Sequence, residues 1–215
     1  MTKRLTTPEK RPPKKRPPEK RPYELGKRLE QMDESRAAIL RAAQAQLAAE
    51  GYRRLTMASL ATESGVTRQT IHNLFGTKTG VLEAVFDVIA LESGMEQMRE
   101  VMMLPPGDAQ LARFVGIFCG FWAKNRVLIR RVHGIGAIEP EFGGVIEARN
   151  RRRLAAATRI VQRMAAENGT QKAAMLAALT SFEFFDALAE SCGSELDAEA
   201  MVLRMARSAA FDELP

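Results

Sequence analysis

Helical spacing of apolar residues along almost the whole chain is the feature that most limits its possible folds. From residue 33 to residue 211, apolar side chains recur every three to four residues, and glycine or proline interrupts the pattern at intervals. This period places the apolar side chains on one face of an α-helix, whereas the alternation typical of strands is confined to scattered short stretches. With 46% hydrophobic residues, a chain of 215 residues is long enough to bury a core. The sequence therefore predicts an all-α globular protein.

The basic charge of the chain is concentrated near its N-terminus. Residues 1–28 hold eleven Lys and Arg against three acidic residues, a charge of +8, and because the whole chain is +6, the rest must be −2. Six of the ten prolines lie in the same segment, in three pentapeptides of the form Pro-x-Lys-Arg-Pro. This composition predicts a disordered or polyproline-like tail over residues 1–30. The tail is either a solubilising arm or an arm attracted to phosphates.

Four helices are expected in the part of the chain that follows the tail. A helix over 33–50 is followed by two short helices over 56–64 and 67–74, and by a longer one over 77–89. Each of the last three begins with a threonine, which is a favourable N-cap residue, and Gly65 separates the two short helices. Two short helices joined by a glycine turn and braced by longer ones form the layout of a helix-turn-helix module.

The outward residues of the second short helix have side chains suited to DNA. Arginine pairs with guanine in the major groove, and glutamine or asparagine pairs with adenine. Hydroxyls, free backbone N–H groups and a cation at helix starts can hold phosphate oxygens. The candidate DNA-binding residues are Thr56, Thr67, Arg68, Gln69, His72, Asn73 and Lys78. The residues alone leave a second interpretation open, in which the threonines are only caps and the polar helix is only a solvated face.

Five short motifs follow one another without a gap between residues 35 and 90. They are Ile39-Leu40-x-x-Ala43, Glu50-Gly51-Tyr52, Thr56-Met57-x-x-Leu60-Ala61, Gly65-Val66-Thr67 and Ile71-x-x-x-Phe75-x-x-Lys78-x-x-x-Leu82. In order and spacing this string resembles the TetR family of bacterial transcriptional regulators. The resemblance implies a DNA-binding domain, which we place at residues 31–80, and a helical regulatory and dimerisation domain over 81–215. It also implies that the candidate residues of the short helices contact DNA.

Two positions depart from the pattern of that family. His72 stands where a tyrosine is usual, and Thr79-Gly80 replaces an acidic pair. A neutral imidazole still donates one hydrogen bond, so contact with the DNA backbone can persist with altered preference. Glycine inside a helix costs about 1 kcal/mol relative to alanine. Both departures bear on operator preference and not on the fold.

The second half of the chain predicts several further helices. They are expected over 95–104, 108–123, 126–133, 141–167, 170–190 and 195–211, with a loop at 134–140. The resemblance implies a two-fold homodimer, built as a four-helix bundle from the helices over 170–190 and 195–211. The first of these is rich in alanine, and small side chains let helices approach closely. The alternative, that both helices only pack on their own domain, stays open.

Aromatic and methionine residues of the second half outline a candidate ligand site. The candidate residues are Met98, Met102, Phe114, Phe118, Trp122, Arg149, Phe182 and Phe185, and the site is expected between the helices over 108–123 and 170–190. Methionine supplies adaptable apolar walls, and Arg149 is a candidate partner for an anion. An aromatic stripe at helical spacing is more often plain core, and Arg149 is equally a surface residue. The chemistry of the ligand does not follow from the sequence.

Several classes of protein are disfavoured by what the sequence lacks. No apolar run is long enough to cross a bilayer, and no secretory signal follows the charged N-terminus. Cys119 and Cys192 are too few for a disulfide framework, and His72 and His133 are the only histidines available for a zinc site. Phosphate-binding glycine loops and nucleophile motifs are missing. We therefore expect a cytoplasmic protein that is not an enzyme and needs no metal or cofactor.

Together these observations favour a TetR-like repressor. We expect it to bind a palindromic DNA operator as a homodimer and to be released by a small-molecule ligand of unknown identity. The alternative is a basic-tailed architectural protein that binds all DNA sequences alike and has no inducer. Affinity for one palindrome at physiological salt distinguishes the two.

Overall fold

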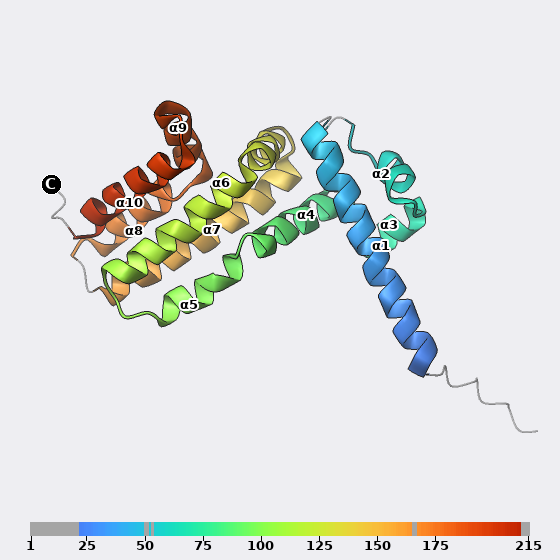
Figure 1. Ribbon diagram of the computed structural model, residues 1–215, viewed down its shortest axis with the longest axis horizontal. Helices are drawn as coiled ribbons and strands as arrows, with labels where there is room; N and C mark the ends of the chain where they lie inside the picture. The colour runs from blue at the N-terminus through green and yellow to red at the C-terminus, as the bar shows by residue number, and fades with distance from the viewer. Residues whose placement is uncertain (1–21, 50–51, 53, 165–166, 212–215) are drawn as a thin grey trace, which may run out of the picture. The chain divides into compact units, whose positions relative to one another are not determined.

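Ten α-helices and one 3₁₀ helix make up the part of the chain that the computed structural model describes, residues 22–49, 52, 54–164 and 167–211 (Figure 1). In chain order they are α1 (Pro22–Ala49), α2 (Met57–Ser64), α3 (Arg68–Phe75), α4 (Lys78–Glu92), η1 (Met95–Gln97), α5 (Met98–Met103), α6 (Asp108–Ile138), α7 (Pro140–Arg163), α8 (Gly169–Leu179), α9 (Phe182–Cys192) and α10 (Glu195–Phe211). These residues contain no strand, which confirms the predicted all-α fold. The chain divides into two compact units, one ending at Glu34 and the other beginning at Ser35, and the packing described below belongs to the second.

Helix α1 begins at Pro22, well before the start expected at Asp33. Residues 22–30, which we expected to belong to the tail, are therefore helical, while residues 1–21 lie outside the described residues. Proline is favoured in the first turn of a helix because its φ is already fixed and its missing N–H would have no partner there. Most of the residues that follow it are good helix formers. The basic, proline-rich composition led us to assign these residues to the tail, although they begin the helix.

Threonine caps and one left-handed glycine shape the helix-turn-helix. The hydroxyl of Thr56 accepts from the backbone N–H of Ser59, and the hydroxyl of Ser59 accepts from that of Thr56, both at 3.0 Å. Thr67 caps α3 in a similar way, accepting from the backbone of Thr70 at 3.1 Å. Between the two helices Gly65 has φ 71°, a conformation that glycine adopts without strain. The caps and the turn lie where the sequence predicted them.

The first turn of α4 lies tightly against the end of α3. Thr77 caps α4 by accepting from the backbone N–H of Gly80 at 3.1 Å. A Cβ atom at position 80 would collide with the carbonyl oxygen of Phe75. This close approach explains why glycine is accommodated in the first turn of α4 despite its low helix propensity.

Helix α6 is kinked where the sequence predicted a boundary between two helices. Asn125 alone within α6 leaves helical geometry, with φ −118° and ψ 15°. Its side-chain amide donates to the hydroxyl of Ser93 at 2.7 Å and to the carbonyl of Phe121 at 3.0 Å. A side chain that bonds outside its own helix is a usual cause of such a kink.

The loop predicted at residues 134–140 is wrong. Helix α6 runs through Gly134 and Gly136 to its end, and a single residue, Glu139, separates it from α7. Gly136 is there for packing, because a Cβ atom on it would collide with the side chain of Ile146, and a Cβ atom at Gly143 would lie 2.7 Å from the carbonyl oxygen of Gly136. The missing side chains let α6 and α7 approach closely beside their turn.

The single helix predicted over 170–190 is also wrong, because the chain breaks at Thr180 and Ser181 into α8 and α9. Ser181 caps α9 by accepting from the backbone N–H of Phe184 at 3.2 Å. The carbonyl of Thr180, which ends α8, accepts from the indole N–H of Trp122 at 3.0 Å. Thr180 therefore ends α8 and Ser181 starts α9. The continuous helical spacing of the apolar residues gave no indication of this break.

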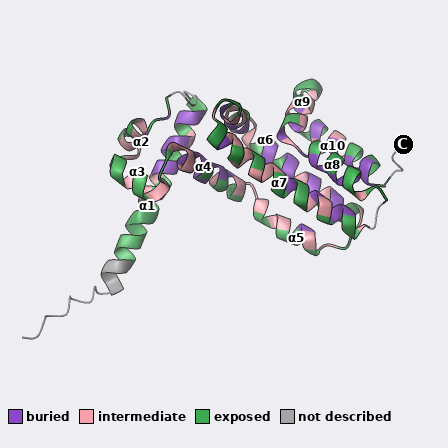
Figure 2. Ribbon diagram, turned by 180° about the vertical axis from the view of Figure 1, so that it is seen from behind, coloured by how far each residue is buried: buried purple, intermediate pink, exposed green. Residues whose placement is uncertain are grey.

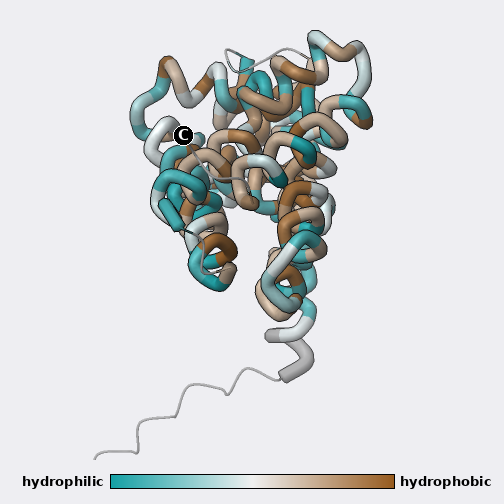
Figure 3. Tube along the Cα trace, turned by 90° about the vertical axis from the view of Figure 1, so that its left-hand side faces the viewer, coloured by the Kyte–Doolittle hydropathy of each residue, from teal (hydrophilic) through white to brown (hydrophobic). Residues whose placement is uncertain are grey.

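Helices α6, α7, α8 and α10 pack on one another, and α9 packs on α6 and α10 (Figure 1). Buried residues follow the facing sides of these helices, with exposed residues on the outer sides (Figure 2). Hydrophilic and hydrophobic residues are accordingly interspersed along the helical trace (Figure 3). Helix α4, which follows the helix-turn-helix directly, packs against α7. Among the described helices, none combines the length and the hydropathy that crossing a membrane requires.

Candidate DNA-binding face and aromatic cavity

Helix α3 presents four polar side chains on one exposed face. Arg68, Gln69, His72 and Asn73 are all exposed, whereas Ile71 on the opposite side is completely buried. The amide of Gln69 donates to the side-chain oxygen of Asn73 at 2.8 Å. This hydrogen bond aligns two amide side chains, each able to address adenine in the major groove. The structure thus brings the predicted base-reading residues together.

The ring of His72 is oriented by the backbone at the end of α3. Its Nδ1 lies 2.6 Å from the carbonyl oxygen of Gly76, and because a carbonyl only accepts, Nδ1 carries the proton. In the neutral ring Nε2 is then an acceptor, and it becomes a donor when the ring is protonated. His72 therefore offers a phosphate no donor from Nε2 until it is charged, a restriction that a tyrosine hydroxyl would not have.

Thr56 and Thr67 are exposed at the starts of α2 and α3. Each hydroxyl accepts from its own helix and also contacts a neighbouring hydroxyl, that of Ser59 at 3.1 Å and that of Thr70 at 2.8 Å. The cap uses the oxygen as an acceptor, so a phosphate would take the hydroxyl proton in place of the neighbouring hydroxyl, to which Thr56 donates it in this structure. The structure places both residues where either role is available.

Lys78 has a partner that the sequence did not indicate. Its ammonium donates to the carbonyl of Tyr52 at 3.2 Å and lies 3.2 Å from the centroid of the Tyr52 ring. Burial lowers the pKa of Lys78, and the nearby carboxylate of Glu139 acts in the opposite direction. Burial also raises the pKa of Tyr52, as do the charge of Glu139 and its hydrogen bond with the Tyr52 side chain. Lys78 is therefore half-buried in a small polar cluster with Tyr52 and Glu139, close to the candidate DNA-binding residues of α3.

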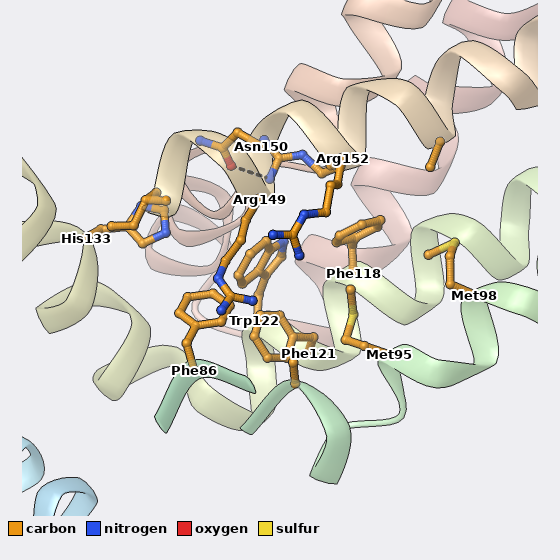
Figure 4. A pocket seen from close by; sticks show the side chains of 14 residues that line it. Phe86, Met95, Met98, Phe118, Phe121, Trp122, His133, Arg149, Asn150 and Arg152 are labelled. Atoms are coloured by element: carbon orange, nitrogen blue, oxygen red, sulfur yellow. Dashed lines mark hydrogen bonds between the residues drawn. The ribbon is translucent and has the colours of Figure 1, made fainter. Parts of the chain in front are cut away.

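A cavity of about 220 Å³ lies between α4, η1, α5, α6 and α7 (Figure 4). One side is apolar and mostly aromatic, formed by Phe86, Met95, Met98, Phe118, Phe121 and Trp122. The other side is polar and comes mainly from α7, with Arg149, Asn150, Arg152 and Arg153, while His133 adds an imidazole from α6. No carboxylate is among the described residues that line the cavity. A hydrophobic space with a few convergent polar groups is the usual form of a small-molecule site.

Arg149 connects the cavity to α4. Its guanidinium donates to the carboxylate of Asp87 at 2.7 Å and stacks over the ring of Phe86, 4.2 Å from the centroid. The same guanidinium lies 3.4 Å from the carbonyl oxygen of Glu83. Its Nε is buried and has no hydrogen-bond partner among the described residues. One edge of this guanidinium is therefore unsatisfied beside the cavity.

Arg153 is a buried cation held by neutral groups. Only 8% of the residue is exposed, and it donates to the carbonyl of Ala177 at 3.2 Å and to the side-chain oxygen of Asn150 at 3.0 Å. Burial lowers the pKa of Arg153, with an opposing contribution from the charge of Glu183. Among the described residues, no carboxylate forms an ion pair with it. A buried charge without a counter-charge is costly, and an anion in the cavity would offset that cost.

The predicted ligand residues divide into two groups. Met98, Phe118, Trp122 and Arg149 line the cavity. Met102, Phe114, Phe182 and Phe185 do not: Met102 faces the outer side near Arg163, and the three phenylalanines are buried in the core. Phe182 packs edge-on behind Trp122, with ring centroids 5.6 Å apart. Helix α7 therefore forms the wall that we had expected from residues 170–190.

Sequence reasoning missed the cavity residues that depend on distant contacts. Phe86 and Phe121 have the spacing of core residues, and nothing local separates them from the rest of the core. Arg153 belongs to a basic run that also includes exposed Arg151 and Arg152, and a basic run is normally a solvated face. The only available signal was position, because Arg149 and Arg153 are four residues apart and so share one side of a helix.

Comparisons with known proteins agree with this architecture. Residues 39–85 match the model of the tetR family of bacterial regulatory proteins. Among curated proteins, none matches the sequence. The matched segment runs from α1 into α4 and includes the whole helix-turn-helix.

Solved structures of TetR-type regulators share the fold. A regulator from Syntrophomonas wolfei is 17% identical, with a TM-score of 0.68 over 85% of this chain and 97% of that one. One from Haloarcula marismortui is 14% identical, with a TM-score of 0.66 over 85% and 100% of the two chains. A transcriptional regulator from Saccharomonospora viridis, solved in complex with choline, is 17% identical, with a TM-score of 0.62 over 79% and 94%. Residues 39–85 of the chain thus match the tetR family of bacterial regulatory proteins, and the chain shares the fold of solved TetR-type regulators.

Proposed function

We propose that the protein is a transcriptional repressor that binds a palindromic operator as a homodimer and is released by a small molecule. The observation that carries this proposal is the exposed face of α3, on which Arg68, Gln69, His72 and Asn73 gather beside the caps Thr56 and Thr67. Side chains of these types read base edges in the major groove, and capped helix starts hold phosphates. Lys78 is the additional cation of this face, positioned by Tyr52.

Homodimerisation is supported by apolar side chains left exposed on the last helices. Met175 on α8 and Leu196, Met205 and Phe211 on α10 are exposed, with Leu196 at 80%. Helices that expose such residues beside small alanines can form a closely packed bundle with a second copy. A dimer would also present two copies of α3, which a palindrome requires. The measurement is the molar mass in solution, and the double variant Met175→Glu/Met205→Glu should shift it to that of a monomer.

Ligand release is supported by the cavity and by its contact with α4. The cavity residues Phe86 and Ala90 belong to α4, which begins directly after the helix-turn-helix. Occupancy can therefore change the position of α4 and with it the presentation of α3. Trp122 on the cavity wall is the only tryptophan of the chain, so its fluorescence reports binding.

The decisive experiment measures affinity for DNA taken from beside the protein's own coding region. Specific repression requires binding to one palindrome that is at least about a thousandfold tighter than binding to random DNA at physiological salt. The alternative, an architectural protein, predicts equal affinity for both. Equal affinities would overturn the proposal, and the exposed amides on α3 favour the first outcome.

A further inference from the structure

We propose that the cavity takes a small organic carboxylate, which replaces Asp87 as the partner of Arg149 and so releases α4 from α7. This inference rests on the proposed function, because it names the class of ligand and the contact through which that ligand acts. Three features of the cavity support it: its size and aromatic wall, its uncompensated cations, and the geometry of the Arg149–Asp87 pair.

The size and lining of the cavity select a small ligand with an apolar body. Its volume of about 220 Å³ lies below the ~300–1,000 Å³ of sites for drug-sized molecules. Four aromatic rings and two methionines form one side, as Figure 4 shows. An aromatic ring or a short branched chain fits such a space, whereas a large polycyclic molecule does not.

The charges around the cavity select an anion. Arg149, Arg152 and Arg153 all line it, and no carboxylate does so among the described residues. Arg153 is nine-tenths buried and bonded only to neutral oxygens. His133, the remaining titratable group of the wall, already pairs with Glu183, which lies outside the lining. A cationic ligand would meet three guanidinium groups, whereas a carboxylate would neutralise one of them.

The geometry of the Arg149–Asp87 contact allows a ligand carboxylate to replace that of Asp87. It joins one guanidinium nitrogen to one carboxylate oxygen, so the pair is not bidentate. The side chain of Asp87 is 68% exposed and that of Arg149 only 17%, so the carboxylate keeps most of its hydration while the cation does not. The Nε of Arg149 has no partner among the described residues. A carboxylate inside the cavity can accept from Nε and from a terminal nitrogen together, which is a stronger arrangement than the present one.

Exchange at Arg149 would act on the helix-turn-helix through α4. Asp87 and Phe86 are neighbours on α4, and both hold the guanidinium of Arg149 on α7. If a ligand takes that guanidinium, α4 loses its ion pair with α7. A ligand shifts an equilibrium only through contacts that differ between the two states, and this ion pair is such a contact.

The class of ligand is tested on the full-length protein without DNA. Benzoate, phenylacetate and 3-phenylpropionate are titrated by calorimetry and by Trp122 fluorescence, alongside their amides and phenethylamine. We expect the best carboxylate to bind at least about tenfold tighter than its amide, because a charge-assisted pair replaces a neutral hydrogen bond. Arg149→Gln should remove this preference, and Arg149→Lys should restore part of it.

Arg151→Gln is the matched control for the ligand class. Arg151 lies on the same helix, is exposed and pairs with Glu147 one turn away, so its loss should leave binding unchanged. An amide that binds as tightly as its carboxylate would overturn the anion class. Carboxylate affinity that survives Arg149→Gln would overturn the role of Arg149. Circular dichroism of each variant excludes unfolding as the cause.

The exchange itself is tested by Asp87→Asn. This variant should bind the best carboxylate about threefold tighter or more, because the competing partner of Arg149 is weakened. The matched control is Glu83→Gln on the same helix, since Glu83 offers Arg149 only its backbone carbonyl. Unchanged carboxylate affinity in Asp87→Asn would overturn the exchange. These titrations contain no DNA, so they test the ligand class and the exchange even if no operator is found. Failure to find an operator would count against the proposed function alone.

Discussion

The ammonium of Lys78 lies 3.2 Å from the centroid of the Tyr52 ring and also 3.2 Å from the Tyr52 carbonyl oxygen. The same residue is thus a structural tie between the start of α4 and the chain that follows α1, as well as a candidate phosphate contact. Replacing it should affect both properties.

Lys78→Met should weaken binding to operator and to random DNA alike, because phosphate contacts carry no sequence information. It should also lower the free energy of unfolding by about 1 kcal/mol, through loss of the cation–π contact and of a hydrogen bond. Urea titration measures the second effect and fluorescence anisotropy the first. Lys78→Arg keeps the charge and should retain most of the DNA affinity. A stability loss without any loss of DNA affinity would restrict Lys78 to its structural role.

Gln69→Ala and Asn73→Ala should each cost about 1–3 kcal/mol on the operator and little on random DNA. Because the two side chains are hydrogen-bonded to each other, the double variant should lose less than the two separate losses together. Competition binding with both DNAs gives the specificity ratio. Gln162→Ala, an exposed position on α7, serves as the control. An unchanged ratio in both single variants would show that α3 does not read bases.

Local chemistry predicted the DNA-binding half well, because its structure is determined by neighbours in sequence. Thr56 and Thr67 cap their helices through contacts three residues away, and Gly65 needs only its own backbone conformation. Which residues of α3 are exposed follows from the 3.6-residue period alone.

Long-range packing decided the features that sequence reasoning missed. Gly136 has the local character of a loop residue, and only its contact with Gly143 on the next helix explains its place inside α6. Arg153 is buried against α8, where the carbonyl of Ala177 accepts its hydrogen bond. The sequence around Arg153 does not indicate this contact. The cavity depends on several helices at once, so four of the eight predicted residues lie outside its lining: three phenylalanines lie in the core and Met102 lies near Arg163.

Gly143→Ala should destabilise the protein, because its Cβ would lie 2.7 Å from the backbone oxygen of Gly136. We expect a loss of about 1–3 kcal/mol, typical of overpacking. Gly144→Ala is the matched control, since a Cβ there meets nothing within 4 Å. It should stabilise the helix by up to about 1 kcal/mol through propensity alone. The midpoint temperatures of unfolding of the two variants distinguish the packing effect from the helix-propensity effect. Equal midpoints would contradict a close approach of α6 and α7.

Deletion of residues 1–21 should reduce the salt dependence of DNA binding. These residues hold nine of the eleven cations of the basic segment, and the deletion leaves α1 intact from Pro22. We expect the slope of log affinity against log salt to become shallower by roughly 2–5, equally for operator and random DNA. Salt titrations of both lengths on one operator measure this. A solubilising arm would leave the slope unchanged.

Acid should weaken the fold partly through Glu183. A hydrogen bond from His133 is the main cause that lowers the pKa of Glu183 to about 2, against the ordinary value of 4.5. A carboxyl whose pKa is lowered by folding stabilises the protein above its unfolded pKa, and this contribution is lost as the pH falls towards its folded pKa. The midpoint temperature of unfolding should therefore decrease as the pH is lowered from about 5 to about 2.5. In Glu183→Gln this decrease should be smaller. Glu167→Gln, at an exposed position, should keep the full decline.

Helix α4 carries Lys78 at its first residue and Asp87 nine positions later, so the two ends of this segment are mechanically coupled. At 1.5 Å per residue they are about 13 Å apart along the axis, and a tilt of about 10° displaces one end by about 2 Å relative to the other. Hydrogen bonds to base edges tolerate only a few tenths of an ångström. If α3 binds DNA as proposed, α4 is a lever arm long enough for the exchange at Asp87 to change whether α3 is in register with the major groove.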